Sequence, residues 1–386
     1  MLACGREDPA ERLQERLRPL AGDAGELLRL ARAHGVLSLL YLRLQRAGLE
    51  AELPPAAAEK LAASHLTLAA RQTRMVSVAA EILQSLAQAG LRCLPLKGTA
   101  LIASSWPDYL PRDMCDLDLL VAPEEAPTAA TALRALGFTV DEESFRFCPW
   151  SPHPIKAARG EVGLDLHTAP WGSLPLEPLR PSVAELWARR RPGALLDRPV
   201  PVPSPEDMVF ILLAGLARDR FTTTLRSWTD LRRLLTAPGR VVDRDRLAAA
   251  AAELRGQRLL ATALRFAEEL FGEEWGPGLA EGDSAAYAAA RPALWRRLLF
   301  EEAATPVPRS ALRLWAGGAG AGSEIAAAGR AWSQEHPGAL CRAGGLGTAL
   351  ALAGGGLAYG CRLLASGRAR RELREECRLL RAVQDC

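Results

Sequence analysis

Two aspartates, Asp116 and Asp118, lie two residues apart in the apolar stretch Cys115–Val121. The composition of this stretch predicts a strand, on which both side chains would project from the same face. Two carboxylates this close repel each other, and a divalent cation relieves the repulsion. Mg²⁺ suits such a pair, because it takes oxygen ligands and keeps positions open for substrate phosphates. The alternative is a strand with acids on a solvent-exposed face, and the Asp-x-Asp pattern alone leaves that choice open.

A third acid, Asp165, lies in Val162–His167, a second apolar stretch that predicts a strand. An acid in a core-like strand is a candidate third metal ligand or general base. His167 shares a face with Asp165 if the strand is regular. It is therefore a candidate for contact with phosphate or acceptor, and a structural, hydrogen-bonded histidine is the equal alternative.

Basic and small residues upstream could bind an anion. Arg92–Lys97 predicts a strand that ends at Gly98, followed by a helix. A glycine at this turn lets a phosphate approach the backbone, and the amides of a helix N-terminus favour negative charge. Lys97 would add a positive charge and Thr99 a hydroxyl donor, and Arg112 could clamp a phosphate.

The elements around these residues change character along the chain. Apolar residues recur every three or four positions, which predicts helices over Pro9–Leu20, Gly25–His34, Leu37–Ala47, Pro55–Ala70 and Met75–Ala89. Strands and helices then alternate as far as residue 168, which indicates an α/β unit. From Ser204 the chain is helical again. We expect a helical region over 1–72, a core over 73–200, a helical domain over 201–315 and a Gly/Ala-rich tail over 316–386.

Composition narrows the function classes. Of the 386 residues, 49% are hydrophobic and 24% are charged, which is typical of a folded chain and not of a disordered one. A net charge of +3 is too small to indicate nucleic acid as a partner. The eight cysteines form no C-x-x-C pair, and no apolar stretch at the N-terminus predicts a signal peptide. We therefore expect reduced thiols and a cytoplasmic location.

One segment, Ala343–Cys361, is apolar, uncharged and nearly long enough to cross a bilayer. Its many glycines and few large side chains favour a buried or loosely packed helix instead. A membrane span is therefore not expected, and peripheral membrane assembly through this segment stays an alternative.

Residues 94–138 resemble a family of bacterial nucleotidyltransferase-like proteins of the polymerase-beta-like superfamily. The resemblance rests on a Leu-Lys-Gly turn, an Arg before an Asp-(aliphatic)-Asp-Leu-Leu-Val strand, and a helix ending in Leu-Gly-Phe. It extends to the strand Asp165-Leu166-His167, to Ser204–Asp207, and to the Arg/Trp-rich segment Arg226–Leu231. In this segment Asp230 is either a contact of the nucleotide site or part of an ordinary helix–helix hydrogen bond.

The resemblance implies an α+β fold, in which a small mixed sheet with helices is flanked by helical regions. It implies an enzyme in which Asp116, Asp118 and Asp165 bind two Mg²⁺ ions and orient attack on the α-phosphate of a nucleoside triphosphate. Departures such as Cys115 before the first Asp, and Gly98-Thr99 where Gly-Ser is usual, bear on substrate placement more than on metal binding.

The expected activity is therefore transfer of a nucleoside monophosphate, with ATP as the first candidate donor. The acceptor would be a hydroxyl of a small molecule, a peptide or a protein. The alternative is a regulatory or scaffold protein that binds nucleotide without turnover.

Overall fold

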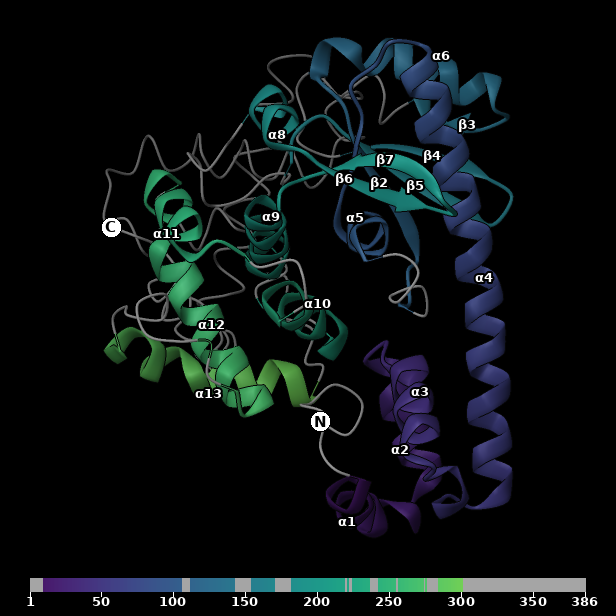
Figure 1. The fold of residues 1–386 in the computed structure, drawn as a ribbon, viewed down its shortest axis with the longest axis vertical. Coiled ribbons are helices and arrows are strands. Elements are labelled where there is room, and N and C mark those ends of the chain that lie inside the picture. Colours follow the sequence, from purple (N-terminus) through teal and green to yellow (C-terminus); the bar gives the residue numbers. More distant parts are fainter. Residues whose placement is uncertain are drawn as a thin grey trace, which may run out of the picture.

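The computed structural model describes residues 10–105, 112–142, 154–170, 182–218, 221, 224–236, 242–254, 256–273, 275 and 284–300. These residues form an α+β structure in which helices predominate around a small mixed sheet, as the sequence predicts (Figure 1). The tail at 316–386 and the segment Ala343–Cys361 lie outside the described residues. Within the described residues, no helix is long and apolar enough to cross a membrane.

The N-terminal region is a helical bundle. It consists of α1 (Ala10–Ala21), α2 (Ala24–Ala33), α3 (Leu37–Ala47), the short 3-10 helix η1 (Glu50–Glu52) and the start of α4 (Pro55–Gln88). The carboxylate of Asp23 accepts the N–H of Glu26 at 3.3 Å and so caps α2. Gly48, with φ of 66°, ends α3 in the left-handed conformation that glycine adopts without strain.

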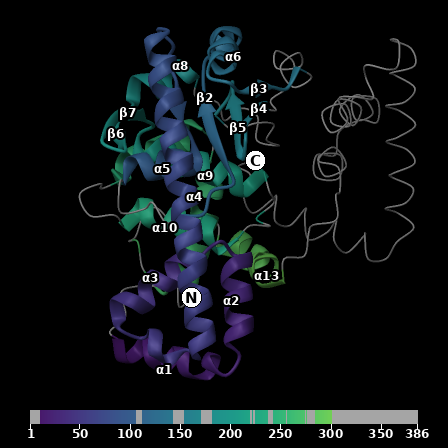
Figure 2. The same cartoon turned by 90° about the vertical axis from the view of Figure 1, so that its right-hand side faces the viewer.

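Helix α4 is one continuous helix of 34 residues, where the sequence predicts two. No glycine or proline lies between its halves, so nothing in the chain interrupts the backbone hydrogen bonds. Most of its buried side chains lie from Gln72 onward, and those from Met75 to Leu86 pack on the sheet. Figure 2 shows α4 running from the bundle to the sheet. The boundary expected after residue 72 therefore falls inside a helix.

The sheet has five strands in the order β1-β2-β5-β4-β3. They are β1 (Leu94–Pro95), β2 (Asp116–Leu120), β3 (Thr139–Val140), β4 (Ile155–Arg159) and β5 (Val162–His167). Strands β2 and β5 are parallel, and the other neighbouring pairs are antiparallel. Helix α5 (Lys97–Ser104) follows β1, and the short 3-10 helix η2 (Pro123–Glu125) with α6 (Ala126–Ala135) joins β2 to β3.

A hairpin follows α8 (Val183–Arg189) and was not anticipated from the sequence. Its strands are β6 (Arg191–Leu195) and β7 (Arg198–Val202). It packs so closely on α5 that a Cβ added at Gly193 would lie 2.8 Å from the carbonyl oxygen of Ala103. Proline-rich strands of this kind give a weak strand signal, which explains why they were missed.

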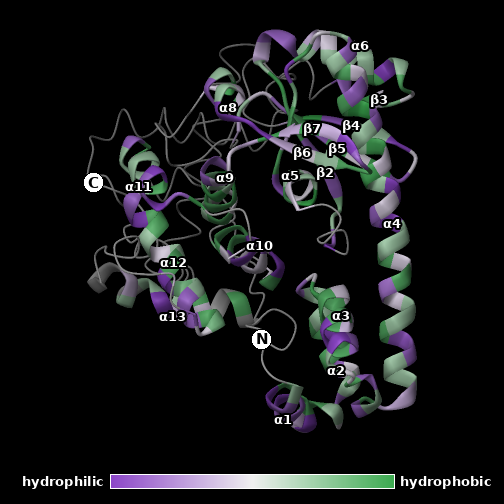
Figure 3. Cartoon of the chain, viewed as in Figure 1, coloured by the Kyte–Doolittle hydropathy of each residue, from purple (hydrophilic) through white to green (hydrophobic). Residues whose placement is uncertain are grey.

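The remaining helices are α9 (Pro205–Arg218), α10 (Leu225–Thr236), α11 (Arg244–Glu253), α12 (Gln257–Phe271) and α13 (Ser284–Phe300). Helix α9 is largely apolar (Figure 3). Buried side chains of these helices share one hydrophobic cluster with those of the N-terminal bundle, so the two ends of the described chain form a common core.

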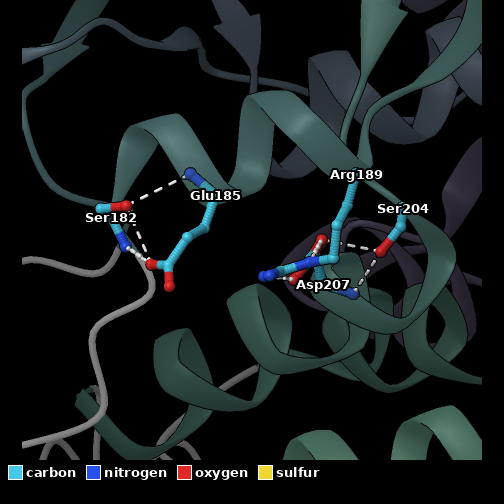
Figure 4. Close-up of polar contacts among 5 residues, drawn as sticks. All are labelled: Ser182, Glu185, Arg189, Ser204 and Asp207. Carbon is cyan, nitrogen blue, oxygen red and sulfur yellow. Dashed lines mark hydrogen bonds and ion pairs between the residues drawn. The ribbon is translucent and has the colours of Figure 1, made fainter.

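The start of α9 is held by a polar network (Figure 4). The hydroxyl of Ser204 accepts the N–H of Asp207 at 3.1 Å and so caps the start of the helix. The Asp207 carboxylate also accepts two hydrogen bonds from Arg189 at the end of α8, at 2.7 and 3.1 Å. Ser182 and Glu185 form a capping box at the start of α8. Both ends of the α8–α9 connection are thus fixed.

Candidate functional site

The acids predicted from sequence meet where β2 and β5 run side by side. The register pairs Asp118 with Asp165 and Asp116 with Gly163 on parallel strands. Ligand atoms of Asp118, Asp165 and His167 all lie within 4.8 Å of one another. Asp116 is not a member of this group of three, although it is near enough for Asp118 and Asp165 to act on its charge.

Asp118 is buried, with an exposed fraction of 5%, and its Oδ1 has two partners. The Lys97 ammonium donates to it at 2.5 Å, and Nε2 of His167 lies 2.8 Å from it. Burial acts to raise the pKa of Asp118, but the hydrogen bond with His167 and the charge of Lys97 outweigh it and lower the pKa to about 2. This carboxylate is therefore ionised at neutral pH.

Asp116 behaves in the opposite way. Partial desolvation, followed by repulsion from Asp118 and Asp165, raises its pKa, although its side chain is accessible to solvent. The charges of Lys97 and Arg226 offset only part of this shift. Two positions apart on β2, the surroundings thus stabilise the anionic form of Asp118 and destabilise that of Asp116.

The donor set fits a magnesium ion. Asp118 and Asp165 supply two carboxylates in register, and Mg²⁺ is commonly bound by one or two carboxylates together with waters and substrate phosphates. His167 contributes a nitrogen, which Mg²⁺ does not favour, and its hydrogen bond instead orients the Asp118 carboxylate.

Lys97 and Gly98 open helix α5. The Leu96 N–H donates to the carbonyl of Asp118 at 2.8 Å, which brings Lys97 beside that residue. Lys97 has a positive φ of 46°, an uncommon conformation for a residue other than glycine. A Cβ added at Gly98 would lie 2.3 Å from Nη1 of Arg112. The glycine therefore leaves room for that arginine, a reason for its presence that differs from the predicted approach of a phosphate.

Arg112, the predicted phosphate clamp, is buried and pairs with Asp230 of α10. Its Nε lies 2.9 and 3.1 Å from the two carboxylate oxygens of Asp230, and its Nη2 lies 2.6 Å from Oδ2. Asp230 thus connects helix α10 to the segment that precedes β2. It lines the cavity, as a contact of the nucleotide site would, but its ion-pair partner, Arg112, does not belong to another helix. Thr99 is buried, and its hydroxyl has no hydrogen-bond partner within the described residues.

A cavity of about 300 Å³ separates the sheet from helices α9 and α10. Its sheet side includes Lys97, Gly98, Asp116 and Asp118, and its helical side includes Ile211, Leu212, Gly215, Leu216, Arg226 and Asp230. Thr99, Asp165 and His167 are not among its lining residues. Of the residues predicted from sequence, the structure thus brings Lys97, Gly98, Arg112, Asp116 and Asp118 to one cavity.

Two parts of the cavity lining were not predicted from the sequence. One is the apolar wall of α9, whose composition also suits a core helix. The other is Arg226, which lies one helical turn before Asp230 and so shares its face of α10. That four-residue spacing was the available signal. Arg226 donates from Nη1 to the carbonyl of Asp113 at 2.8 Å, next to the start of β2.

Comparisons with known proteins place the chain in a family. The model of a family described as "Uncharacterised nucleotidyltransferase" matches residues 21–272. No curated protein matches the chain. Two solved structures of ANT(2")-Ia are similar in part: a crystal structure in complex with adenylyl-2"-tobramycin and a solution structure of this antibiotic-resistance factor. They are 19% and 20% identical, with TM-scores of 0.36 and 0.35. They cover 47% and 48% of this chain, and 96% and 92% of their own. On the family match, the chain belongs to this nucleotidyltransferase family.

Proposed function

We propose that the protein is a magnesium-dependent enzyme that transfers a nucleoside monophosphate from a nucleoside triphosphate to a hydroxyl group. ATP is the first candidate donor. The observation that carries the proposal is the pairing of Asp118 with Asp165 on adjacent parallel strands, next to a cavity of about 300 Å³. Two carboxylates in register beside an open volume match the needs of a metal-bound triphosphate.

In this proposal, Asp118 and Asp165 hold the metal, and Asp116 joins them when nucleotide binds. Two ions are expected. When bound, they would neutralise charge on the attacking and leaving oxygens. The surroundings of Asp116 disfavour its charged form, so a cation nearby would stabilise it.

The reaction would proceed by in-line displacement. The acceptor oxygen forms a bond to the α-phosphorus, the bond from that phosphorus to the bridging oxygen of the β-phosphate breaks, and pyrophosphate leaves. Asp165 would take the proton from the acceptor hydroxyl. Lys97, Gly98, Thr99, Arg112 and His167 remain the proposed nucleotide-binding residues, of which Lys97, Gly98 and Arg112 line the cavity.

The acceptor would be a small molecule, a peptide or a protein side chain. We also propose a cytoplasmic location. Both cysteines of the described residues, Cys93 and Cys115, are free thiols, as expected in a reducing compartment.

Isothermal titration of ATP, GTP, CTP and UTP with Mg²⁺ tests the proposal. The wild type should bind one or more of these triphosphates only when the metal is present. The double variant Asp116→Ala/Asp118→Ala should lose this binding. Glu161→Gln is a matched control, because Glu161 is an exposed acid at the turn between β4 and β5.

Incubation of the metal–triphosphate complex with candidate acceptors, followed by detection of pyrophosphate, then tests turnover. Binding without pyrophosphate release for any acceptor would favour the regulatory or scaffold alternative. No binding of any triphosphate to the wild type would contradict the proposed function.

A further inference from the structure

Within the described ranges, three basic side chains line the cavity, and their surroundings differ. Lys97 is paired with Asp118 at 2.5 Å, and Arg112 is paired with Asp230. Among the residues that the structure describes, Arg226 has no carboxylate within ion-pairing distance. Its side chain instead donates a hydrogen bond to a backbone carbonyl, that of Asp113. Among the described residues that line the cavity, Arg226 is therefore the basic side chain that forms no ion pair, although its charge acts on Asp116 at longer range.

The guanidinium of Arg226 also has unused donor capacity. Its Nε is fully buried and has no hydrogen-bond partner within the described part of the chain. Leaving a buried donor unpaired is unfavourable, and the penalty is larger for a charged group. An anionic ligand in the cavity would relieve it, because phosphate oxygens match the planar donor fork of arginine.

The position of Arg226 is supported from the N-terminal bundle. Its backbone N–H donates to the carbonyl of His34 at 3.1 Å, and the N–H of Leu225 donates to Nδ1 of His34 at 3.2 Å. The side-chain stem passes over Gly35, where an added Cβ would lie 3.3 Å from Cδ of Arg226. The bundle thus holds the first turn of α10 against the cavity.

We infer that Arg226 binds the phosphate groups of the nucleoside triphosphate, and that His34 and Gly35 are positioning residues for it. The inference rests on the proposed function and deepens it. In this arrangement, Arg226 on the helical side of the cavity binds the polyphosphate, and the acids of the sheet side lie opposite it. It also makes the N-terminal bundle part of the binding site.

Titration of MgATP and of adenosine into wild type, Arg226→Gln and Arg226→Lys tests the inference. Loss of charge-assisted hydrogen bonds should weaken MgATP binding to Arg226→Gln by about 10- to 100-fold. Arg226→Lys should recover part of the loss, because it keeps the charge without the fork. Adenosine, which has no phosphates, should bind both variants as it binds wild type. Arg46→Gln is a matched control, since Arg46 is exposed and does not line the cavity.

The outcomes separate the two proposals. If wild type binds MgATP and Arg226→Gln binds it within twofold, Arg226 is not a phosphate ligand and the proposed function stands. An equal loss of MgATP and adenosine in Arg226→Gln would also overturn the inference, because it would indicate a structural role. Absence of triphosphate binding to the wild type would overturn the proposed function and the assignment of Arg226 with it.

Discussion

The two sides of the cavity are built in different ways. On the sheet side, the lining acids Asp116 and Asp118 come from strand β2, and a regular register places Asp118 opposite Asp165 of β5. On the helical side, α10 is held by contacts across long stretches of sequence: Arg112 to Asp230 spans 118 positions, and His34 to Leu225 spans 191. Local sequence pattern therefore predicts the strands that carry the acids, whereas contacts between residues far apart in the sequence hold the helical side.

The buried pair of Arg112 and Asp230 should give the largest effect on stability. Asp230→Ala leaves the Arg112 charge buried without its partner, and we expect a loss of about 3–5 kcal/mol in the free energy of unfolding. Urea denaturation measures this loss. The double variant Arg112→Met/Asp230→Leu should recover much of it, and Arg29→Ala, which breaks an exposed pair with Glu26, should have little effect. A single variant as stable as wild type would show that the pair does not hold the two sides together.

Removing the buried acid of the sheet side should give the largest effect on activity. Asp118→Asn keeps the shape of the side chain but removes the charge, and we expect a loss in pyrophosphate release of about 100- to 1000-fold. The measurement is the rate with a fixed Mg²⁺–triphosphate complex, and Glu161→Gln serves again as the control. Activity within a few-fold of wild type would exclude Asp118 as a metal ligand.

Removing the cap that His34 provides to α10 should have a smaller effect, which should appear both in stability and in MgATP binding. His34→Ala removes an acceptor for the N–H of Leu225, which should cost about 0.5–2 kcal/mol of stability and weaken MgATP binding. Ser182→Ala is the matched control, because it removes a cap at α8, outside the cavity lining. It should cost a similar free energy without changing MgATP binding. Equal effects of both variants on MgATP binding would contradict a positioning role for His34.

The smallest effect concerns Asp116, whose pKa is raised. A folded-state pKa above the unfolded value means that stability falls as pH rises through the interval between them, and the full penalty is present above the folded value. Asp116→Asn should therefore raise the melting temperature of the metal-free protein at pH 7. This gain should vanish as pH falls to the ordinary value for aspartate, about 3.9.

Asp118 should show the reverse sign, because its pKa is lowered to about 2. Its ionised form stabilises the fold above the ordinary aspartate pKa, and this contribution is lost as pH falls toward 2. Asp118→Asn should thus lower the melting temperature at pH 7. Melting curves in EDTA for the two variants provide the test, and shifts of the same sign would contradict the charge distribution described for the site.

The sequence predicts the strands on the sheet side of the cavity better than it predicts the helical side. Strands β2 and β5 are found where their apolar stretches predict them. The group of three possible metal ligands contains the expected Asp118 and Asp165 but has His167 in place of the expected Asp116. The continuity of α4 was missed because period alone cannot tell one long helix from two. Arg226 belongs to the segment that carries the resemblance, but the sequence did not place it at the cavity, because that place depends on contacts with Asp113 and His34 far away in the chain.

The contact between His34 and α10 has a consequence for the order of assembly during synthesis. His34 is made 191 residues before Leu225, the residue whose N–H it accepts. At about 5–20 residues per second, a ribosome needs roughly 10–40 s to cover that distance. During this interval the bundle, and later the acid-bearing strands β2 and β5, are made before the helix that closes the cavity. The newly made chain therefore carries its acidic residues well before it carries Arg226, and the site is completed only late in translation.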